Sequence, residues 1–151
     1  MNNPHLNISK EFEERAVQIN RISKKTKGGN KMRFAVLMVV GDKRGRVGTA
    51  LSKATDVASA MRKSAAAAQR RLITVPMKGN TIPHSIRYST GAAEILIKPA
   101  PVGTGVIAGG AMRAVLELAG IKDVVAKIIG TRNKVANVNA TILALSKLKN
   151  I

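Results

Sequence analysis

Cysteine and tryptophan are absent from this chain of 151 residues, and other aromatic rings are scarce. The lack of cysteine excludes disulfides, thiol nucleophiles and thiolate zinc sites, and it is compatible with a reducing compartment such as the cytoplasm. The ring-bearing residues are Phe12, Phe34 and Tyr88. Proteins that grip single strands usually stack bases on several rings, each worth about 1–3 kcal/mol. This composition therefore excludes a base-stacking platform.

Long apolar runs are also missing. The longest, at 34–40, is far shorter than the roughly 20 residues that a membrane span requires, so we expect no transmembrane helix. Residues 1–14 lack the apolar centre of a signal peptide and contain Glu11, Glu13 and Glu14. We therefore expect 1–14 to form a polar leader and not a secretory or transit peptide.

Side chains suited to catalysis are few. His5 and His84 are the only histidines, and no histidine–carboxylate constellation is visible. Because His84 and Ser85 are neighbours in an expected strand, their side chains point to opposite faces and cannot form the hydrogen bond that activates a serine. We interpret His84 as a packed or capping residue. We expect no enzymatic activity, no metal site and no cofactor.

Acidic residues are scarce, whereas basic ones are abundant. The chain has 26 Lys and Arg against 8 Asp and Glu, a net charge of +18 and a pI near 11.3. Between residues 15 and 41 no acidic residue offsets the basic ones, which are Arg15, Arg21, Lys24, Lys25, Lys27, Lys31 and Arg33. A polyanion is the natural partner, and nucleic acid binding gains from counterion release and steering. Without rings for stacking, phosphate contact and recognition of the shape of structured RNA or DNA remain.

The first half of the chain predicts three antiparallel strands and a helix. We expect strands at 15–23, 34–40 and 46–51, joined by a loop at 24–31 and a turn at 41–45. The first strand should bulge near Arg21, and the continuous apolarity of 34–40 requires burial on both faces. Thr55 is expected to cap the helix, with Asp56 in its first turn. The buried stripe of the helix should consist of Val57, Met61, Ala65, Ala68 and Leu72.

The second half predicts further strands and two helices. We expect a hairpin of 72–77 and 81–88 turning at 78–80, strands at 93–98 and 124–130, and a helix opened by the glycine-rich 103–110. Gly120 should end that helix, and Val138, Ile142, Leu145 and Leu148 define a closing amphipathic helix. The order indicates an α+β fold. We expect a leader at 1–14, a double-stranded-RNA-binding-like domain at 15–73, and a split βαβ domain at 74–151.

The pattern Gly103-x-Gly105-x-x-Ala108, followed by Asp123, has the form of a dinucleotide-binding fingerprint. Its context argues against that function, because two prolines separate the preceding strand from the glycines, and Asp123 precedes its strand instead of ending it. The same glycines allow close backbone approach, and the start of the next helix offers free N–H groups to an RNA phosphate. A purely structural turn is the alternative.

The basic cluster at 24–33 is interpreted as an RNA-binding hairpin. The alternative is a solvated charged tip, but such a tip has no need to exclude acidic residues, and Gly28 and Gly29 let the backbone approach a phosphate. Lys63 and Arg70 share an outward helix face, where basic residues also occur simply for solubility. The candidate RNA-binding residues are Arg21, Lys24, Lys25, Thr26, Lys27, Gly28, Gly29, Asn30, Lys31, Arg33, Lys53, Lys63, Arg70, Thr104, Gly105 and Arg132.

Several segments together resemble one family. They are Asn20-Arg21 leading to Lys24 through Gly29, then Val39-Val40-Gly41-Asp42, Gly45-Arg46-Val47-Gly48, and Gly103-Thr104-Gly105 running through Arg113-Ala114-Val115-Leu116-Glu117 to Ala119-Gly120. In these segments the chain is similar to the bacterial-type family of small-ribosomal-subunit protein S5, from about Arg15 to Leu148. Two glycines usual in the family are Ala50 and Ser52 here, which argues against close backbone contact with RNA at those positions.

The resemblance implies an N-terminal domain like the double-stranded-RNA-binding fold and a C-terminal split βαβ domain with a left-handed crossover. It implies a cytoplasmic structural constituent of the small ribosomal subunit that binds small-subunit rRNA and influences assembly and decoding accuracy. It also implies contacts with small-subunit proteins four and eight and a place near the messenger RNA entry path. The cluster at 24–31 corresponds to the family's long rRNA-binding hairpin. The alternative, which composition alone permits, is a free-standing basic RNA-binding protein or RNA chaperone.

Overall fold

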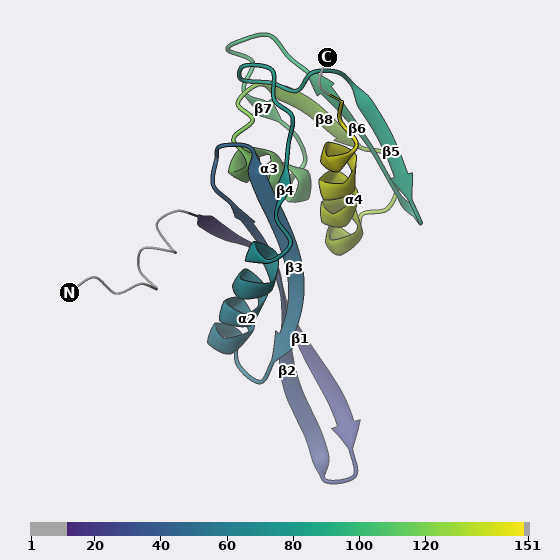
Figure 1. The fold of residues 1–151 in the computed structure, drawn as a ribbon. Coiled ribbons are helices and arrows are strands. Elements are labelled where there is room, and N and C mark those ends of the chain that lie inside the picture. The colour runs from purple at the N-terminus through teal and green to yellow at the C-terminus, as the bar shows by residue number, and fades with distance from the viewer. Residues whose placement is uncertain (1–11, 150–151) are drawn as a thin grey trace, which may run out of the picture.

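The structure, a computed structural model, describes residues 12–149, apart from the side chains of residues 24–26 and 30. Residues 1–11 of the expected leader lie outside this range. The end of that expected leader is part of a strand, because β1 (Glu13–Thr26) begins at Glu13. Figure 1 shows two sheets, with a long hairpin that projects from the N-terminal one.

The first sheet is antiparallel, in the order β1-β2-β3-β4. Its strands after β1 are β2 (Gly29–Gly41), β3 (Arg46–Ala54) and the two-residue β4 (Ile73–Thr74). The predicted three-stranded antiparallel unit is present, with β4 as an additional strand. The bulge in β1 lies between Ala16 and Gln18, so the prediction of a bulge near Arg21 is wrong.

α2 (Val57–Gln69) covers one face of this sheet (Figure 1). Its N-cap is Asp56 and not the expected Thr55. The Asp56 carboxylate accepts a hydrogen bond from the Ser59 N–H at 3.1 Å. Such a bond satisfies one of the backbone donors left free in the first turn of a helix.

The buried face of α2 differs from the predicted stripe. It consists of Ala60, Ser64, Ala65 and Ala68, whereas Met61 is 36% exposed. These small side chains let the helix lie close to β3, where a Cβ at Gly48 would collide with the Ala68 carbonyl oxygen. Ala50 and Ser52, which replace glycines usual in the family, are buried on this same face of the sheet. They are therefore not surface positions that an RNA backbone reaches.

The apolar run in β2 is buried on both faces, as its composition predicted. Val36, Met38 and Val40 pack with α2, whereas Leu37 and Val39 belong to the core of the C-terminal half. Successive strand residues point to opposite faces, so one strand contributes to two cores. The N-terminal sheet therefore lies between α2 and the C-terminal half.

The second sheet has the order β5-β6-β8-β7. Its strands are β5 (Ile86–Thr90), β6 (Ala93–Pro99), β7 (Val106–Ile107) and β8 (Val124–Ile128), and only β7 and β8 are parallel to each other. α3 (Gly110–Ala119) connects these two strands, and α4 (Lys134–Ser146) follows β8. Val138, Ile142 and Leu145 of α4 are buried as predicted. Gly120 ends α3 with a φ of 92°, a conformation that favours glycine.

The predicted hairpin of 72–77 and 81–88 is wrong. β4 pairs with β3, β5 pairs with β6, and an isolated bridge closes the turn between the two segments. Val75 and Ile82 are buried in the core while the chain crosses from the first sheet to the second. The apolar residues of this segment are spaced as in strands because they pack into the core along an irregular connection, and not because they form a hairpin. β7 has only two residues and was not predicted.

The turn between β2 and β3 lies against the C-terminal end of α3. The Lys43 N–H donates to the Leu118 carbonyl at 2.9 Å. The Gly45 N–H donates to the Ala119 carbonyl at 2.8 Å. The last carbonyls of a helix have no partner within the helix, and these bonds satisfy two of them. We call this contact the seam, and it joins the two halves through their backbones.

Candidate nucleic-acid interface

The basic cluster lies at the end of the β1–β2 hairpin, which projects away from both sheets (Figure 1). The strands stay paired as far as Thr26 and Gly29, which leaves a turn of Lys27 and Gly28. The predicted loop at 24–31 is therefore mostly strand. Gly29 has a φ of +125°, a conformation that residues with side chains disfavour. The turn consequently depends on a glycine at this position.

The end of the hairpin is rich in basic residues and has no acidic neighbours. Lys27, Lys31 and Arg33 are exposed, and among residues 12–149 none of the three pairs with a carboxylate. The strand register sets Lys24 opposite Lys31 and Lys25 opposite Asn30. Like charges directly opposite each other on a ribbon destabilise it. A bound polyanion relieves this repulsion.

The candidate residues of the first sheet are divided between its faces. Alternation along β2 and β3 sets Lys31, Arg33 and Lys53 on the face turned away from α2. Arg21 lies on the other face of the hairpin, where its Nη2 is 2.8 Å from the Met32 sulfur. A ligand that covers one face therefore reaches Lys31, Arg33 and Lys53 together, without Arg21.

The remaining candidates lie elsewhere. Lys63 is within α2 and Arg70 is its C-cap, and both are exposed. Thr104 and Gly105 precede β7, and Arg132 is exposed between β8 and α4. In Figure 1 the hairpin tip and β7 lie at opposite ends of the molecule. The structure thus brings the hairpin residues and Lys53 together, but not the whole predicted set.

The loop that contains Gly103 and Gly105 is held by hydrogen bonds to the carboxylate of Asp123. The N–H groups of Gly103 and Gly105 donate to Oδ1 of Asp123 at 3.1 and 3.0 Å, and Asp123 is 5% exposed. The N–H and the hydroxyl of Thr104 donate to the Pro101 carbonyl at 3.2 and 2.8 Å. The N–H groups within this loop are therefore occupied, whereas the free N–H groups that the sequence predicts belong to the start of the helix that follows. RNA contact at Thr104 and Gly105 stays a prediction, through other atoms.

His84 has a structural position, as interpreted from the sequence. Its Nε2 accepts a hydrogen bond from the Lys149 N–H at 2.9 Å, so Nδ1 carries the proton and donates to the Ser85 carbonyl at 2.9 Å. The imidazole thus ties the segment after α4 to the one before β5. In the described part of the chain, no cluster of His, Asp and Glu has the size of a metal site. None of the helices at 12–149 has the length and apolarity to span a bilayer.

Two family models match most of the chain. Residues 12–76 match "Ribosomal protein S5, N-terminal domain", and residues 88–151 match "Ribosomal protein S5, C-terminal domain". The chain belongs to the ribosomal protein S5 family. S5 is a structural, non-enzymatic constituent of the small ribosomal subunit that binds rRNA and serves translation. The resemblance seen in the sequence and the α+β fold expected from it are both confirmed.

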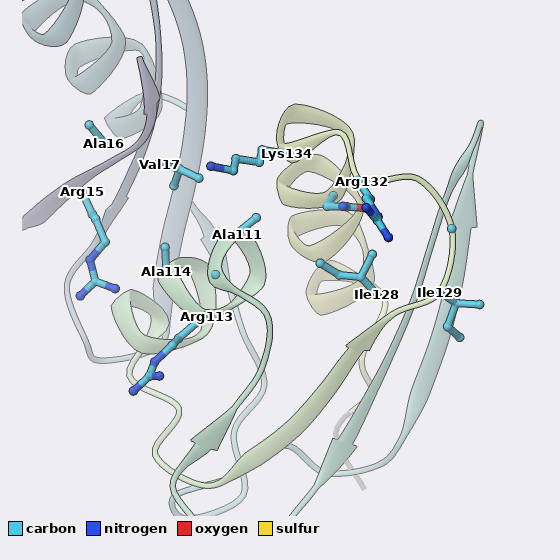
Figure 2. Close-up of a pocket in the computed structure, with 13 residues that line it drawn as sticks. Arg15, Ala16, Val17, Ala111, Arg113, Ala114, Ile128, Ile129, Arg132 and Lys134 are labelled. Atoms are coloured by element: carbon cyan, nitrogen blue, oxygen red, sulfur yellow. The ribbon is translucent and has the colours of Figure 1, made fainter. Parts of the chain in front are cut away.

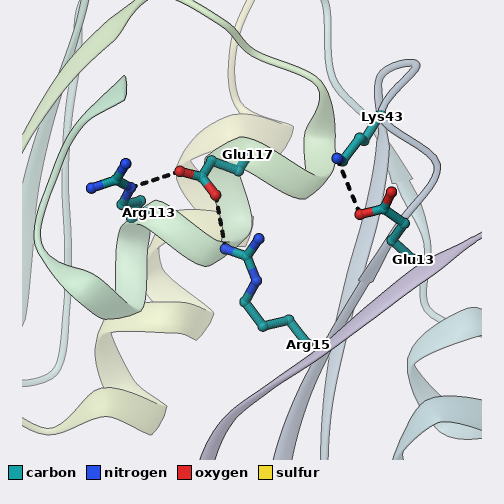
Figure 3. A network of polar contacts seen from close by, with 5 residues as sticks. All are labelled: Glu13, Arg15, Lys43, Arg113 and Glu117. Carbon is teal, nitrogen blue, oxygen red and sulfur yellow. Dashed lines mark hydrogen bonds and ion pairs between the residues drawn. The ribbon is translucent and has the colours of Figure 1, made fainter. Parts of the chain in front are cut away.

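In this S5 chain, Glu117 of α3 attaches the base of the hairpin to the C-terminal half (Figure 3). Arg113 Nε donates to Glu117 Oε1 at 2.6 Å, and Arg15 Nη1 donates to Oε2 at 2.9 Å. The hydrogen bond from Arg113 and then the one from Arg15 lower the pKa of Glu117. Beside them, Lys43 pairs with Glu13 at 3.1 Å. The Arg15–Glu117 pair therefore joins β1 to α3 across a long stretch of sequence, and the Lys43–Glu13 pair joins β1 to the turn between β2 and β3.

Glu117→Gln is expected to remove part of the acid sensitivity of folding. The pKa of Glu117 in the folded protein lies below its ordinary value of 4.5, so its stabilising effect is full above that value and is lost as pH falls through the folded-state pKa. The free energy of unfolding of the unmodified protein should therefore approach that of the variant as pH falls below the folded-state pKa of Glu117. Urea unfolding over a pH series measures the difference. Glu14→Gln, at an exposed position of β1, is the control, and a difference that stays constant with pH would contradict the expectation.

Proposed function

We propose that this protein holds small-subunit rRNA through the β1–β2 hairpin and acts as an RNA-positioning scaffold in which no bond is made or broken. The observation that supports this is the hairpin itself, which projects from the body and carries no acidic residue between 15 and 41. Lys27, Lys31 and Arg33 neutralise phosphates, and the glycines of the turn let the RNA backbone approach closely. Lys53, on the same face as Lys31 and Arg33, extends this surface toward the body.

Family membership and the high positive charge of the chain support a finer role, which is also part of the proposal. Through its rRNA contacts the protein supports subunit assembly and translational accuracy in the cytoplasm. Small-subunit proteins four and eight, and messenger RNA near its entry path, are further partners. The additional rRNA contacts that we propose, beyond the hairpin and Lys53, are Lys63, Arg70, Thr104, Gly105 and Arg132.

Sedimentation of a lysate that contains a tagged copy tests the proposal. The tagged protein should migrate with small subunits in moderate salt. A variant with Lys27, Lys31 and Arg33 changed to glutamine should move toward the light fractions. The matched control changes Lys98, Lys122 and Lys127, which are exposed in the C-terminal half, to glutamine. An unmodified protein that stays in light fractions, or spreads over unrelated RNA, would be a free-standing RNA-binding protein or RNA chaperone and would contradict the proposal.

A further inference from the structure

Methionine is the only sulfur-containing residue of this chain. The sequence has six methionines and no cysteine, so an oxidant that reaches the protein meets no thiol that would react first. Met38 and Met112 are buried, at 1% and 0% exposed, and Met77 is half-buried. Met32 and Met61 are 42% and 36% exposed. Among the methionines that the structure describes, oxidation should therefore begin at Met32 and Met61.

The sulfur of Met32 is in contact with a cation of the hairpin. Arg21 donates to this sulfur from Nε at 3.0 Å and from Nη2 at 2.8 Å. The strand register sets Met32 opposite Ser23, two residues along β1 from Arg21, so the two side chains lie on the same face. A thioether is a weak acceptor. The guanidinium of Arg21 is therefore positioned by the sulfur but can leave it at little cost.

Oxidation converts the sulfur of Met32 into a stronger acceptor. A peroxide transfers one oxygen atom to the thioether: a sulfur lone pair forms the new S–O bond, the O–O bond breaks, and hydrogen peroxide leaves as water. The sulfur loses two electrons and the peroxide gains them. A hydrogen bond from a guanidinium to the sulfoxide oxygen is charge-assisted. Because Nε and Nη2 of Arg21 already face the sulfur, a small movement brings them to this oxygen.

The same two nitrogens matter for RNA. Nε and Nη2 form one edge of the guanidinium, and such an edge can donate to two oxygens of one phosphate. Arg21 is the candidate RNA-binding residue on the face of the hairpin opposite Lys31 and Arg33. While Met32 is a thioether, a phosphate competes for this edge with a weak acceptor. After oxidation it competes with a strong one.

We propose that Met32 is an oxidation site of the hairpin, whose sulfoxide binds Arg21 and withdraws it from rRNA. The oxidant is a peroxide. The reverse step needs a methionine sulfoxide reductase that uses thiols: two thiols form a disulfide, and the sulfoxide oxygen leaves as water. The modified contact itself depends only on Arg21 and Met32, whereas its effect on affinity rests on the proposed rRNA-binding function.

Met61 provides an internal control. Its exposure is close to that of Met32, but it lies in α2, and in the described part of the chain no arginine donates to its sulfur. Peroxide treatment of the full chain, followed by mass spectrometry of its peptides, should show Met32 and Met61 gaining one oxygen at comparable rates. Oxidation of Met32 that is more than about tenfold slower than that of Met61 would overturn the site.

Nuclear magnetic resonance of the free protein tests the contact without RNA. On oxidation the Arg21 Nε–H signal should shift, and its exchange with water should slow by about threefold or more, because this N–H then donates to the sulfoxide oxygen. Met32→Leu has no sulfur at this position and should show neither change. An Arg21 Nε–H that exchanges equally fast before and after oxidation of Met32 would overturn the contact.

The affinity for a small-subunit rRNA fragment tests the consequence. Oxidation should weaken binding by about threefold to tenfold in the wild-type chain and in Met61→Leu, and the reductase should restore it. Oxidation should have no effect in Met32→Leu or in Arg21→Gln, which lacks the guanidinium that the sulfoxide would bind. Both positions are exposed, so these variants should fold.

Arg132→Gln is the matched control for the loss of charge in Arg21→Gln. Arg132 lines a cavity of about 750 Å³ between the base of β1 and the start of α4, on the body of the protein (Figure 2). This variant should bind rRNA less tightly than the wild-type chain, because Arg132 is itself a proposed contact. The factor by which oxidation weakens binding should be unchanged, and its loss in Arg132→Gln would overturn the assignment to Arg21.

These measurements separate the two possible failures. A wild-type chain that does not bind the fragment before oxidation would contradict the proposed function, while slowed exchange at Arg21 would still support the modified contact. Slowed exchange with unchanged affinity would overturn the withdrawal of Arg21 from rRNA and leave binding by the hairpin intact. An equal loss of affinity on oxidation of Met32→Leu and of the wild-type chain would assign the effect to another methionine and would also overturn the proposal.

Discussion

Lys27→Glu together with Lys31→Glu is expected to lower the affinity for a small-subunit rRNA fragment by roughly 10- to 100-fold and to flatten its dependence on salt. Both lysines are exposed in the part of the hairpin, residues 15–41, that has no acidic residue, so the change removes two phosphate contacts and adds repulsion. If the RNA behaves as duplex DNA does, the slope against log salt falls by up to about 0.9 for each lost contact. Fluorescence anisotropy over a series of salt concentrations measures both quantities.

A matched pair separates the hairpin from net charge. Lys98→Glu with Lys127→Glu makes the same change in charge at exposed positions of the second sheet. Long-range steering depends on the whole charge of the protein, whereas released counterions depend on the phosphates that are contacted. The control pair should therefore change the affinity modestly and the slope little. Equal effects of the two pairs would remove the hairpin from the interface.

Where local sequence determines local structure, the fold was predictable. The apolar run at 34–40 indicated a strand buried on both faces, because no polar residue interrupts it. Gly120 indicated the end of α3, because the left-handed conformation there favours glycine. The apolar spacing of α4 indicated its buried face, including Val138 and Leu145. In each case the signal lies within a few residues of the structure that it determines.

Elements that depend on distant contacts were not predictable in this way. The turn-forming residues at 24–31 suggested a loop, yet the strands continue to Thr26 and resume at Gly29, because pairing set at the base of the hairpin extends along it. Residues 72–88 have strand-like spacing, but Val75 is buried by the tertiary core while the chain connects two sheets. Asp56 replaces Thr55 as N-cap, a shift of one residue within a sequence that offers two capping side chains.

The same division applies to the candidate site. The excess of cations at the hairpin is a property of composition and is visible in the sequence. Asp123, in contrast, was noted in the sequence as part of a dinucleotide-binding pattern whose context argued against that function, and only the folded chain shows that it accepts hydrogen bonds from the N–H groups of Gly103 and Gly105. Met32 gave no local signal, because its contact with Arg21 depends on the register between β1 and β2.

The second large effect that we expect is a loss of stability when the seam is disrupted. Gly41→Ala should lower the free energy of unfolding by on the order of 3 kcal/mol or more. A Cβ at Gly41 would collide with the Leu118 oxygen and lie 2.6 Å from its carbonyl carbon and 2.9 Å from its Cβ. Leu118 is 1% exposed, and its oxygen accepts the Lys43 N–H. Neither partner can move away without breaking the backbone contact that joins the two halves. Urea unfolding measures the change.

Gly110→Ala is the matched control, because a Cβ there meets nothing within 4 Å and the residue lies in α3. Alanine should leave stability unchanged or raise it by up to about 1 kcal/mol. Gly120→Ala approaches the seam from the other side, where a Cβ collides with the Lys43 oxygen and the φ of 92° strains any residue with a side chain. If Gly41→Ala and Gly120→Ala cost no more than Gly110→Ala, the seam is loose. A scaffold that positions RNA requires the hairpin to be held at a fixed position relative to the C-terminal half, and a loose seam would not meet this requirement.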